Sequence, residues 1–283
     1  MASFDFITSA SKAYEFVWYY KGYLARVAVP VLFVEIFCVL SIASLGGIEE
    51  LGMLRHNLIM MPAIFVEALF FAMFVRFVVY HEPIHIWGTL VDAPEINESD
   101  RIIKHIKGAD LSRKDALQVS IACYILVFIF FTVLAWGVML PASKVLPMSP
   151  EMQEQAIENL LPVPVRMFIA LCVFTVIVWT TRLCVVNVPA AMGFRVSDYL
   201  KKMGGINNSA KMIILIFLCS FPVFAILLPF YSAIIGLLSF SPAFALIFEK
   251  ILLYATVLLT YALSIAGLTF AFQELMTKED KGK

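Results

Sequence analysis

Two acidic residues, Glu35 and Glu67, stand inside long apolar stretches and are the strongest candidates for chemistry. Glu35 lies roughly ten residues into one stretch and Glu67 roughly nine into the next, so in helices both carboxyls are expected ~14 Å deep in a bilayer. An acid at that depth is costly and by default indicates a proton relay or a cation contact. Two neighbouring carboxylates also repel each other, so at least one is expected to be protonated at pH 7.

A structural role is the alternative for these acids. One or both would then be protonated and hydrogen-bonded to a backbone carbonyl, to Ser41 or to a tyrosine. The other apolar stretches offer no third carboxylate, histidine or asparagine that completes a recognisable transport site, and Asn187 is the nearest candidate.

Two arginines share a spacing near the ends of apolar stretches. Arg76 and Arg182 each stand seven residues before a proline, Pro83 and Pro189. Because a guanidinium binds phosphate bidentately, this pattern predicts lipid-phosphate contacts at both arginines. The alternatives are snorkelling to the headgroups and pairing with a buried acid, with Glu67 as the first suspect for Arg76.

Other site signatures fail. His81 and His85 are four residues apart, but Pro83 between them breaks the helix that would align two metal ligands. The five cysteines lie in apolar stretches without C-x-x-C spacing, which argues against disulfides and zinc. We therefore predict no catalytic residue, no metal ligand and no cofactor, and a protein that is not an enzyme.

The elements that must position these residues are apolar helices. The chain is 61% hydrophobic and 15% charged, far from the composition of a soluble domain. Its apolar stretches are each long enough to cross a ~30 Å hydrocarbon core. They predict an all-α polytopic membrane protein of six transmembrane helices in one domain, residues 1–283, with these approximate spans: Arg26–Leu45, Leu58–Tyr80, Leu117–Leu140, Val163–Val188, Met212–Gly236 and Phe244–Phe272.

Basic residues gather in alternate gaps between the spans. Fifteen Lys and Arg residues fall before the first span, in the second and fourth connections and in the tail, whereas four fall on the other side. Since cytoplasmic segments carry the excess of positive charge, both termini are expected in the cytoplasm.

The spans also suggest three pseudo-repeats, at about residues 1–90, 91–193 and 194–283. Each unit begins with a short interfacial amphipathic helix, expected at Phe4–Tyr20, Ser99–Ile106 and Ser197–Met203. Ser197 is the expected cap of the third, and each helix is expected to stop at a glycine: Gly22, Gly108 and Gly204. These helices either bind anionic lipid or merely connect and orient the spans.

The stretch from Trp179-Thr-Thr-Arg182 through Pro189-Ala190-Ala191, Gly193, Ser197, Leu200 and Gly204 resembles six-span bacterial proteins of the YciC type. It is also similar to the membrane domain attached to some glycerophosphodiester phosphodiesterases, and Arg76-Phe-Val-Val-Tyr-His-Glu82-Pro83 resembles the arginine-to-Glu-Pro stretch at the second span of related proteins. The resemblance implies a multi-pass protein of the bacterial inner membrane. The phosphodiesterase catalytic domain is absent, so no hydrolase activity carries over.

Two function classes follow. The first is a non-enzymatic membrane-homeostasis, lipid-contacting or assembly role, with anionic lipids and a membrane-protein partner or second copy as partners, and no nucleic acid. The second is a small transporter or channel that uses Glu35 and Glu67. A water-accessible cavity reaching the two acids favours transport, whereas a solid bundle with a basic inner surface favours the first class.

Overall fold

The computed structural model describes residues 4–45, 47–86, 109–145, 162–203, 205–237 and 242–277, and every regular element among them is helical. This confirms the all-α prediction. The helices are α1 (Phe6–Tyr19), α2 (Lys21–Ser44), α3 (Gly47–Tyr80), α4 (Arg113–Val145), α6 (Val163–Cys184), α7 (Asn187–Ala191), α8 (Val196–Lys202), α9 (Ile206–Leu237) and α10 (Pro242–Thr277).

Six segments are long and apolar enough to cross a membrane, which confirms the number and approximate places of the predicted spans. They are Lys21–Ser44, Arg55–Tyr80, Arg113–Leu134, Val163–Ala191, Ile206–Tyr231 and Ile247–Met276. The protein is therefore an integral membrane protein by the length and composition of its helices. The threefold repeat stays a prediction.

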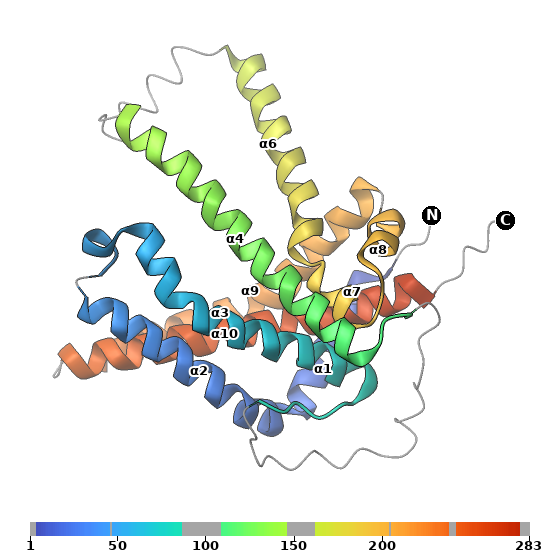
Figure 1. Cartoon of the computed structure of the whole chain (residues 1–283), viewed down its shortest axis with the longest axis horizontal. Helices are drawn as coiled ribbons and strands as arrows, with labels where there is room; N and C mark the ends of the chain where they lie inside the picture. Colours follow the sequence, from blue (N-terminus) through green and yellow to red (C-terminus); the bar gives the residue numbers. More distant parts are fainter. Residues whose placement is uncertain are drawn as a thin grey trace.

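The helices form a packed group and a diverging hairpin. α2 packs on α3, α9 packs on α10, and α1 lies against both α9 and α10. α4 and α6 fan away from this group, as the green and yellow helices of Figure 1 show. Large apolar side chains such as Leu126, Phe168 and Phe174 are exposed along them, an arrangement that suits contact with acyl chains.

The first surface helix forms where it was expected, and it packs on the bundle. Asp5 caps α1, because its carboxylate accepts hydrogen bonds from the Ile7 and Thr8 amides at 3.0 and 3.4 Å. One side of α1, with Ala13 and Val17, is buried, whereas Ile7 and Trp18 on other faces are exposed. The helix therefore packs one side against the bundle and exposes the apolar side chains Ile7 and Trp18 on its other faces.

A tyrosine hydroxyl fastens α1 to α9. Pro222 lies inside α9 and has no N–H, so the carbonyl of Leu218 loses its helical partner. Tyr14 Oη donates to that carbonyl at 3.2 Å and to the Cys219 carbonyl at 2.9 Å. The surface helix thus satisfies a backbone group that the proline leaves open within the spanning helix.

Three details of the expected surface helices are wrong or lie outside the described residues. Gly22 does not stop the first helix, because α1 ends at Tyr19 and Gly22 lies inside α2. Ser197 is not the cap of α8, because Arg195 holds that position and Ser197 is within the helix. The second helix, at 99–106, and the glycines Gly108 and Gly204 are outside the described residues.

The chain does use a glycine to end α7. Gly193 has φ +93°, the left-handed region that side chains avoid, and its N–H donates to the Ala190 carbonyl at 2.9 Å. A Cβ at this position would also meet Ala109 at 3.4 Å. Gly193 was not among the glycines that the sequence pattern predicted to end a helix.

Candidate functional site

The C-terminal end of α7 is bound by several distant parts of the chain. The carbonyls of Ala191, Met192 and Gly193 accept hydrogen bonds from Arg76 Nη1 at 3.1 Å, Tyr80 Oη at 2.6 Å and the Leu111 amide at 3.1 Å, respectively. A cation and two neutral donors therefore occupy the negative end of a short helix whose five residues are all buried.

Arg76 also binds Glu82, six residues further along the chain. The Arg76 Nε and Nη2 atoms donate to the two oxygens of Glu82 at 2.8 and 2.5 Å, a bidentate pair. Arg113, at the start of α4, donates to Glu82 Oε2 at 2.8 Å. One carboxylate thus links the end of α3 to the beginning of α4 and, through Arg76, to α7.

The charge of Glu82 follows from this geometry. Partial burial would raise the pKa of its carboxyl, but hydrogen bonds and positive charge from Arg76 and Arg113 outweigh burial and hold the pKa below its ordinary value of 4.5. Glu82 is therefore ionised at neutral pH and compensates the buried guanidinium of Arg76.

Arg182 makes different contacts. Its Nε donates to Ser209 Oγ in α9, and its carbonyl accepts a hydrogen bond from Tyr199 Oη at 3.2 Å. Like Arg76, it is more than nine-tenths buried. Both predicted phosphate-binding arginines therefore have protein partners, and their contact with lipid phosphate stays a prediction.

Glu35 and Glu67 lie together in the packed group. Their carboxyls are close enough to interact, and Tyr124 Oη of α4 donates to Glu67 Oε2 at 3.1 Å. Two carboxyl groups that share an apolar site do not both ionise, because desolvation and mutual repulsion disfavour the second charge. Glu35 Oε2 is buried and has no hydrogen-bond partner within the part of the chain that the structure describes. The pair is thus a place where a proton can be held or exchanged.

Tyrosines surround the two acids. Tyr124 contacts Glu67 directly, and Tyr254 and Tyr261 of α10 lie near enough to interact electrostatically with both carboxyls. Arg76, the suspected partner of Glu67, binds Glu82 instead. The acid pair is therefore separate from the arginine network at the end of α3.

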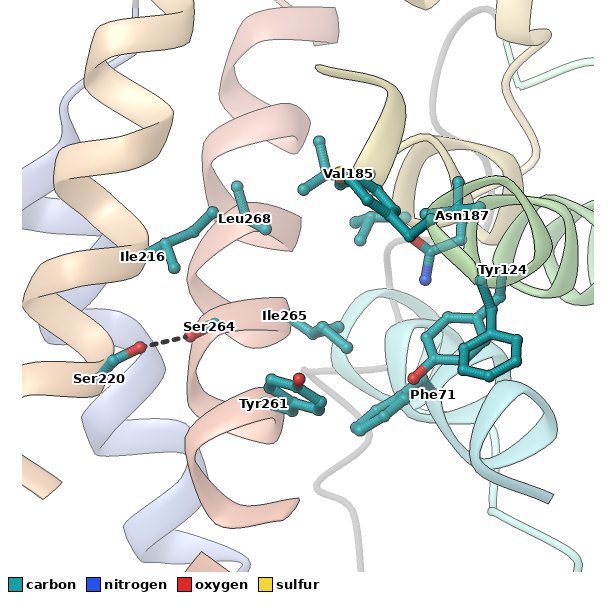
Figure 2. A pocket seen from close by; sticks show the side chains of 15 residues that line it. Phe71, Tyr124, Val185, Asn187, Ile216, Ser220, Tyr261, Ser264, Ile265 and Leu268 are labelled. Carbon is teal, nitrogen blue, oxygen red and sulfur yellow. Dashed lines mark hydrogen bonds between the residues drawn. The ribbon is translucent and has the colours of Figure 1, made fainter. Parts of the chain in front are cut away.

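A cavity of about 360 Å³ lies beside the acid pair. Figure 2 shows Ile216 and Ser220 of α9 on one side, Tyr124, Asn187 and Phe71 on the other, and α10 between them. Ser220 and Ser264 hydrogen-bond across α9 and α10 at 3.3 Å. Tyr124 both lines this cavity and binds Glu67, so one side chain connects the cavity to the acids.

A second cavity of about 330 Å³ lies between α2 and α10. Alanines of the two helices line it, and small side chains leave space between neighbouring helices: Ala25, Ala28, Ala255 and Ala262. Its other walls are Val17, Leu24, Leu32, Phe70, Leu258 and Leu259. Among the described residues that line it, Lys21 is the one with a charged side chain. We call it the α2–α10 groove. Lys21 Nζ sits 3.5 Å from the centre of the exposed Trp18 ring.

The two histidines considered as metal ligands lie in the segment that follows α3. His81 comes directly after the helix and has φ 52°, and His85 is exposed. Within the described ranges there is no group of three or more His, Cys, Asp or Glu side chains placed to hold a metal ion.

Sequence reasoning missed Glu82, Tyr124 and Lys21 as site residues. The Glu82-Pro83 pair after Arg76 was a usable signal for the first, whereas Tyr124 and Lys21 become visible only when the helices are packed. Comparisons with protein families, with curated proteins and with solved structures found no match to this chain.

Proposed function

We propose that this integral membrane protein is non-enzymatic and holds an anionic phospholipid of the cytoplasmic leaflet in the α2–α10 groove, as part of a membrane-homeostasis or assembly role in a bacterial inner membrane. The observation that carries the proposal is the combination of an apolar groove with the cationic side chain of Lys21 at its edge. Lys21 adds a third candidate for phosphate contact to Arg76 and Arg182, whose contacts with lipid phosphate stay predictions.

The dimensions of the groove suit an acyl chain. Its lining on α2 runs from Lys21 to Leu32, which are eleven helical steps apart, or ~16 Å of helix. One leaflet accounts for half of a ~30 Å hydrocarbon core, or ~15 Å. A chain lying along α2 would therefore extend from the headgroup level to the midplane and replace water or disordered lipid with ordered apolar contacts.

The position of Lys21 suits a phosphate. Lys21 is the first residue of α2, and it follows an interfacial helix whose Trp18 and Tyr19 are exposed. Tryptophan and tyrosine favour the headgroup region, which places the ammonium at phosphate level. A lysine near an anionic leaflet contributes about 1 kcal/mol to binding, so the groove would favour phosphatidylglycerol or cardiolipin over a zwitterionic lipid.

The proposed orientation has both termini in the cytoplasm. It rests on the distribution of Lys and Arg and agrees with a contact between the two ends of the chain, since the Asp5 amide donates to Glu274 Oε2 at 3.3 Å. Reporter fusions after Lys283 and within 143–158 should give cytoplasmic and external signals, respectively. An external signal from the fusion at the C-terminus would contradict this orientation.

Transport is the second candidate, and the Glu35–Glu67 pair favours it. A carboxyl pair that holds a proton lies one hydrogen bond from the wall of the 360 Å³ cavity, through Tyr124. Proton release from this pair would change the charge beside the cavity, as a proton-linked transporter requires.

Native mass spectrometry in mild detergent tests the lipid proposal. The protein should retain added phosphatidylglycerol better than phosphatidylcholine, and Lys21→Gln should reduce retention of phosphatidylglycerol about fivefold, the equivalent of one lysine near the surface. Lys12→Gln is the matched control, because Lys12 is exposed on α1 and does not line the groove. Equal retention of both lipids, or equal effects of the two substitutions, would contradict the proposal.

A further inference from the structure

The cavity beside the acid pair, defined above with Figure 2, has a largely aromatic lining. Aromatic rings from three helices border it: Phe71, Tyr124, Phe128, Phe131 and Tyr261. Among the described residues that line it there is no lysine, arginine or histidine. Aromatic faces are electron-rich and attract cations, so the lining favours a positive group and offers no charge partner to an anion.

Polar groups break the apolar surface at a few places. Asn187 is 6% exposed, and its side-chain amide points into the cavity in Figure 2. The backbone carbonyl of Asn187 accepts a hydrogen bond from Ser120 Oγ at 2.8 Å, which fixes the backbone at this residue. A ligand pocket is typically apolar with a few placed polar groups, and a volume of about 360 Å³ is within the usual range for small molecules.

Two carboxyl groups lie behind one wall of this cavity. Tyr124 separates the cavity from Glu67, to which its hydroxyl donates at 3.1 Å, and Glu35 lies directly behind Glu67. Tyr261, another lining residue, also interacts with both acids. Loss of a proton from this pair leaves a negative charge, which in a low-dielectric membrane interior favours a cation over an anion across a separation of one side chain.

We propose that this cavity binds a hydrophobic cation, a molecule with an apolar body and an amine or quaternary ammonium group. This is a second site, distinct in place and in charge preference from the α2–α10 groove. The aromatic rings hold the apolar body and face the ammonium, the Asn187 amide orients it, and the acid pair supplies the favourable field.

Binding of radiolabelled benzyltrimethylammonium to the protein in nanodiscs tests the proposal, with empty nanodiscs as the blank. Neopentylbenzene is the competitor that decides, because it has the same shape with carbon in place of the charged nitrogen. It should displace the cation only at about 2- to 30-fold higher concentration, the range expected for cation–aromatic contacts. Phenylacetate, of opposite charge, should not displace it.

Variants locate the site. Phe128→Leu should weaken binding of the cation about two- to fivefold, whereas Phe130→Leu, on the exposed face of the same helix, should leave it unchanged. Lys21→Gln should also leave cation binding unchanged, so failure of the lipid proposal and failure of this one can be told apart. Absence of saturable binding above empty nanodiscs, equal potency of neopentylbenzene, or equal effects of the two phenylalanine variants would overturn the assignment.

Discussion

Arg76 and Glu82 form a bidentate ion pair at the end of α3, with Nε···Oε2 and Nη2···Oε1 distances of 2.8 and 2.5 Å. The pair also fixes two other elements, because Arg76 binds the Ala191 carbonyl of α7 and Glu82 binds Arg113 of α4. It therefore joins three parts of the chain at the point where a span leaves the apolar region.

Glu82→Gln should lower the free energy of unfolding by about 2–3 kcal/mol. Breaking a fully buried pair costs about 3–5 kcal/mol. We expect a smaller loss for Glu82→Gln because the Glu82 side chain is 25% exposed. Unfolding in mixed micelles measures the change. Asp110→Asn is the control, because the Asp110–Arg195 pair is 3.9 Å long and exposed, and its loss should cost less than about 1 kcal/mol. Similar small losses for both variants would show that the Arg76–Glu82 pair is not structural.

Stability should fall at acid pH because of the same carboxylate. The folded protein holds the pKa of Glu82 below the ordinary 4.5, so its contribution is complete above about pH 4.5 and is lost as pH falls through the lower, folded value. Unfolding midpoints measured from pH 7 to pH 3 should decline more steeply for the wild type than for Glu82→Gln. Parallel curves would assign the acid sensitivity to other groups.

Tyr14→Phe should destabilise the protein by about 1–3 kcal/mol, because the Leu218 carbonyl beside Pro222 loses the donor that replaces its helical one. Pro222→Ala restores a backbone N–H, so Tyr14→Phe should cost less in that background. Tyr19→Phe, at a residue that is 74% exposed, is the control and should change little. An equal cost of Tyr14→Phe with and without Pro222 would mean that the hydroxyl acts elsewhere.

Glu67→Gln should leave the thermal stability in detergent close to that of the wild type. Glutamine resembles a neutral carboxyl group, and its amide oxygen can still accept the hydrogen bond from Tyr124. Tyr124→Phe removes that bond and should cost about 1 kcal/mol. If Glu67→Gln collapses stability while Glu67→Asp does not, the residue is ionised and has a positive partner.

The sequence was sufficient for the spans and for part of the site. Twenty or so apolar residues in a row permit few structures in a membrane, so the six helices follow from composition alone. Counting residues from the span ends placed Glu35 and Glu67 at one depth, where the structure brings them into contact. Depth alone, however, gives no rotation about a helix axis, so the counting did not identify Tyr124.

The partner of Arg76 depends on a local turn that composition does not reveal. His81 adopts φ 52°, and the chain turns back so that Glu82 reaches an arginine six residues earlier. The prediction that Gly22 ends the first helix was wrong, because the boundary between α1 and α2 lies at Tyr20 and no glycine is needed there. The α2–α10 groove requires two alanine faces to meet, which only the tertiary arrangement determines.

Photo-crosslinking tests most directly whether an anionic lipid occupies the α2–α10 groove. Phosphatidylglycerol with a photoactivatable acyl chain should label peptides that contain Leu24, Ala28, Leu258 and Ala262, and Lys21→Gln should reduce the labelling while Lys12→Gln does not. Labelling confined to the exposed faces of α4 and α6, or unchanged by Lys21→Gln, would contradict the account.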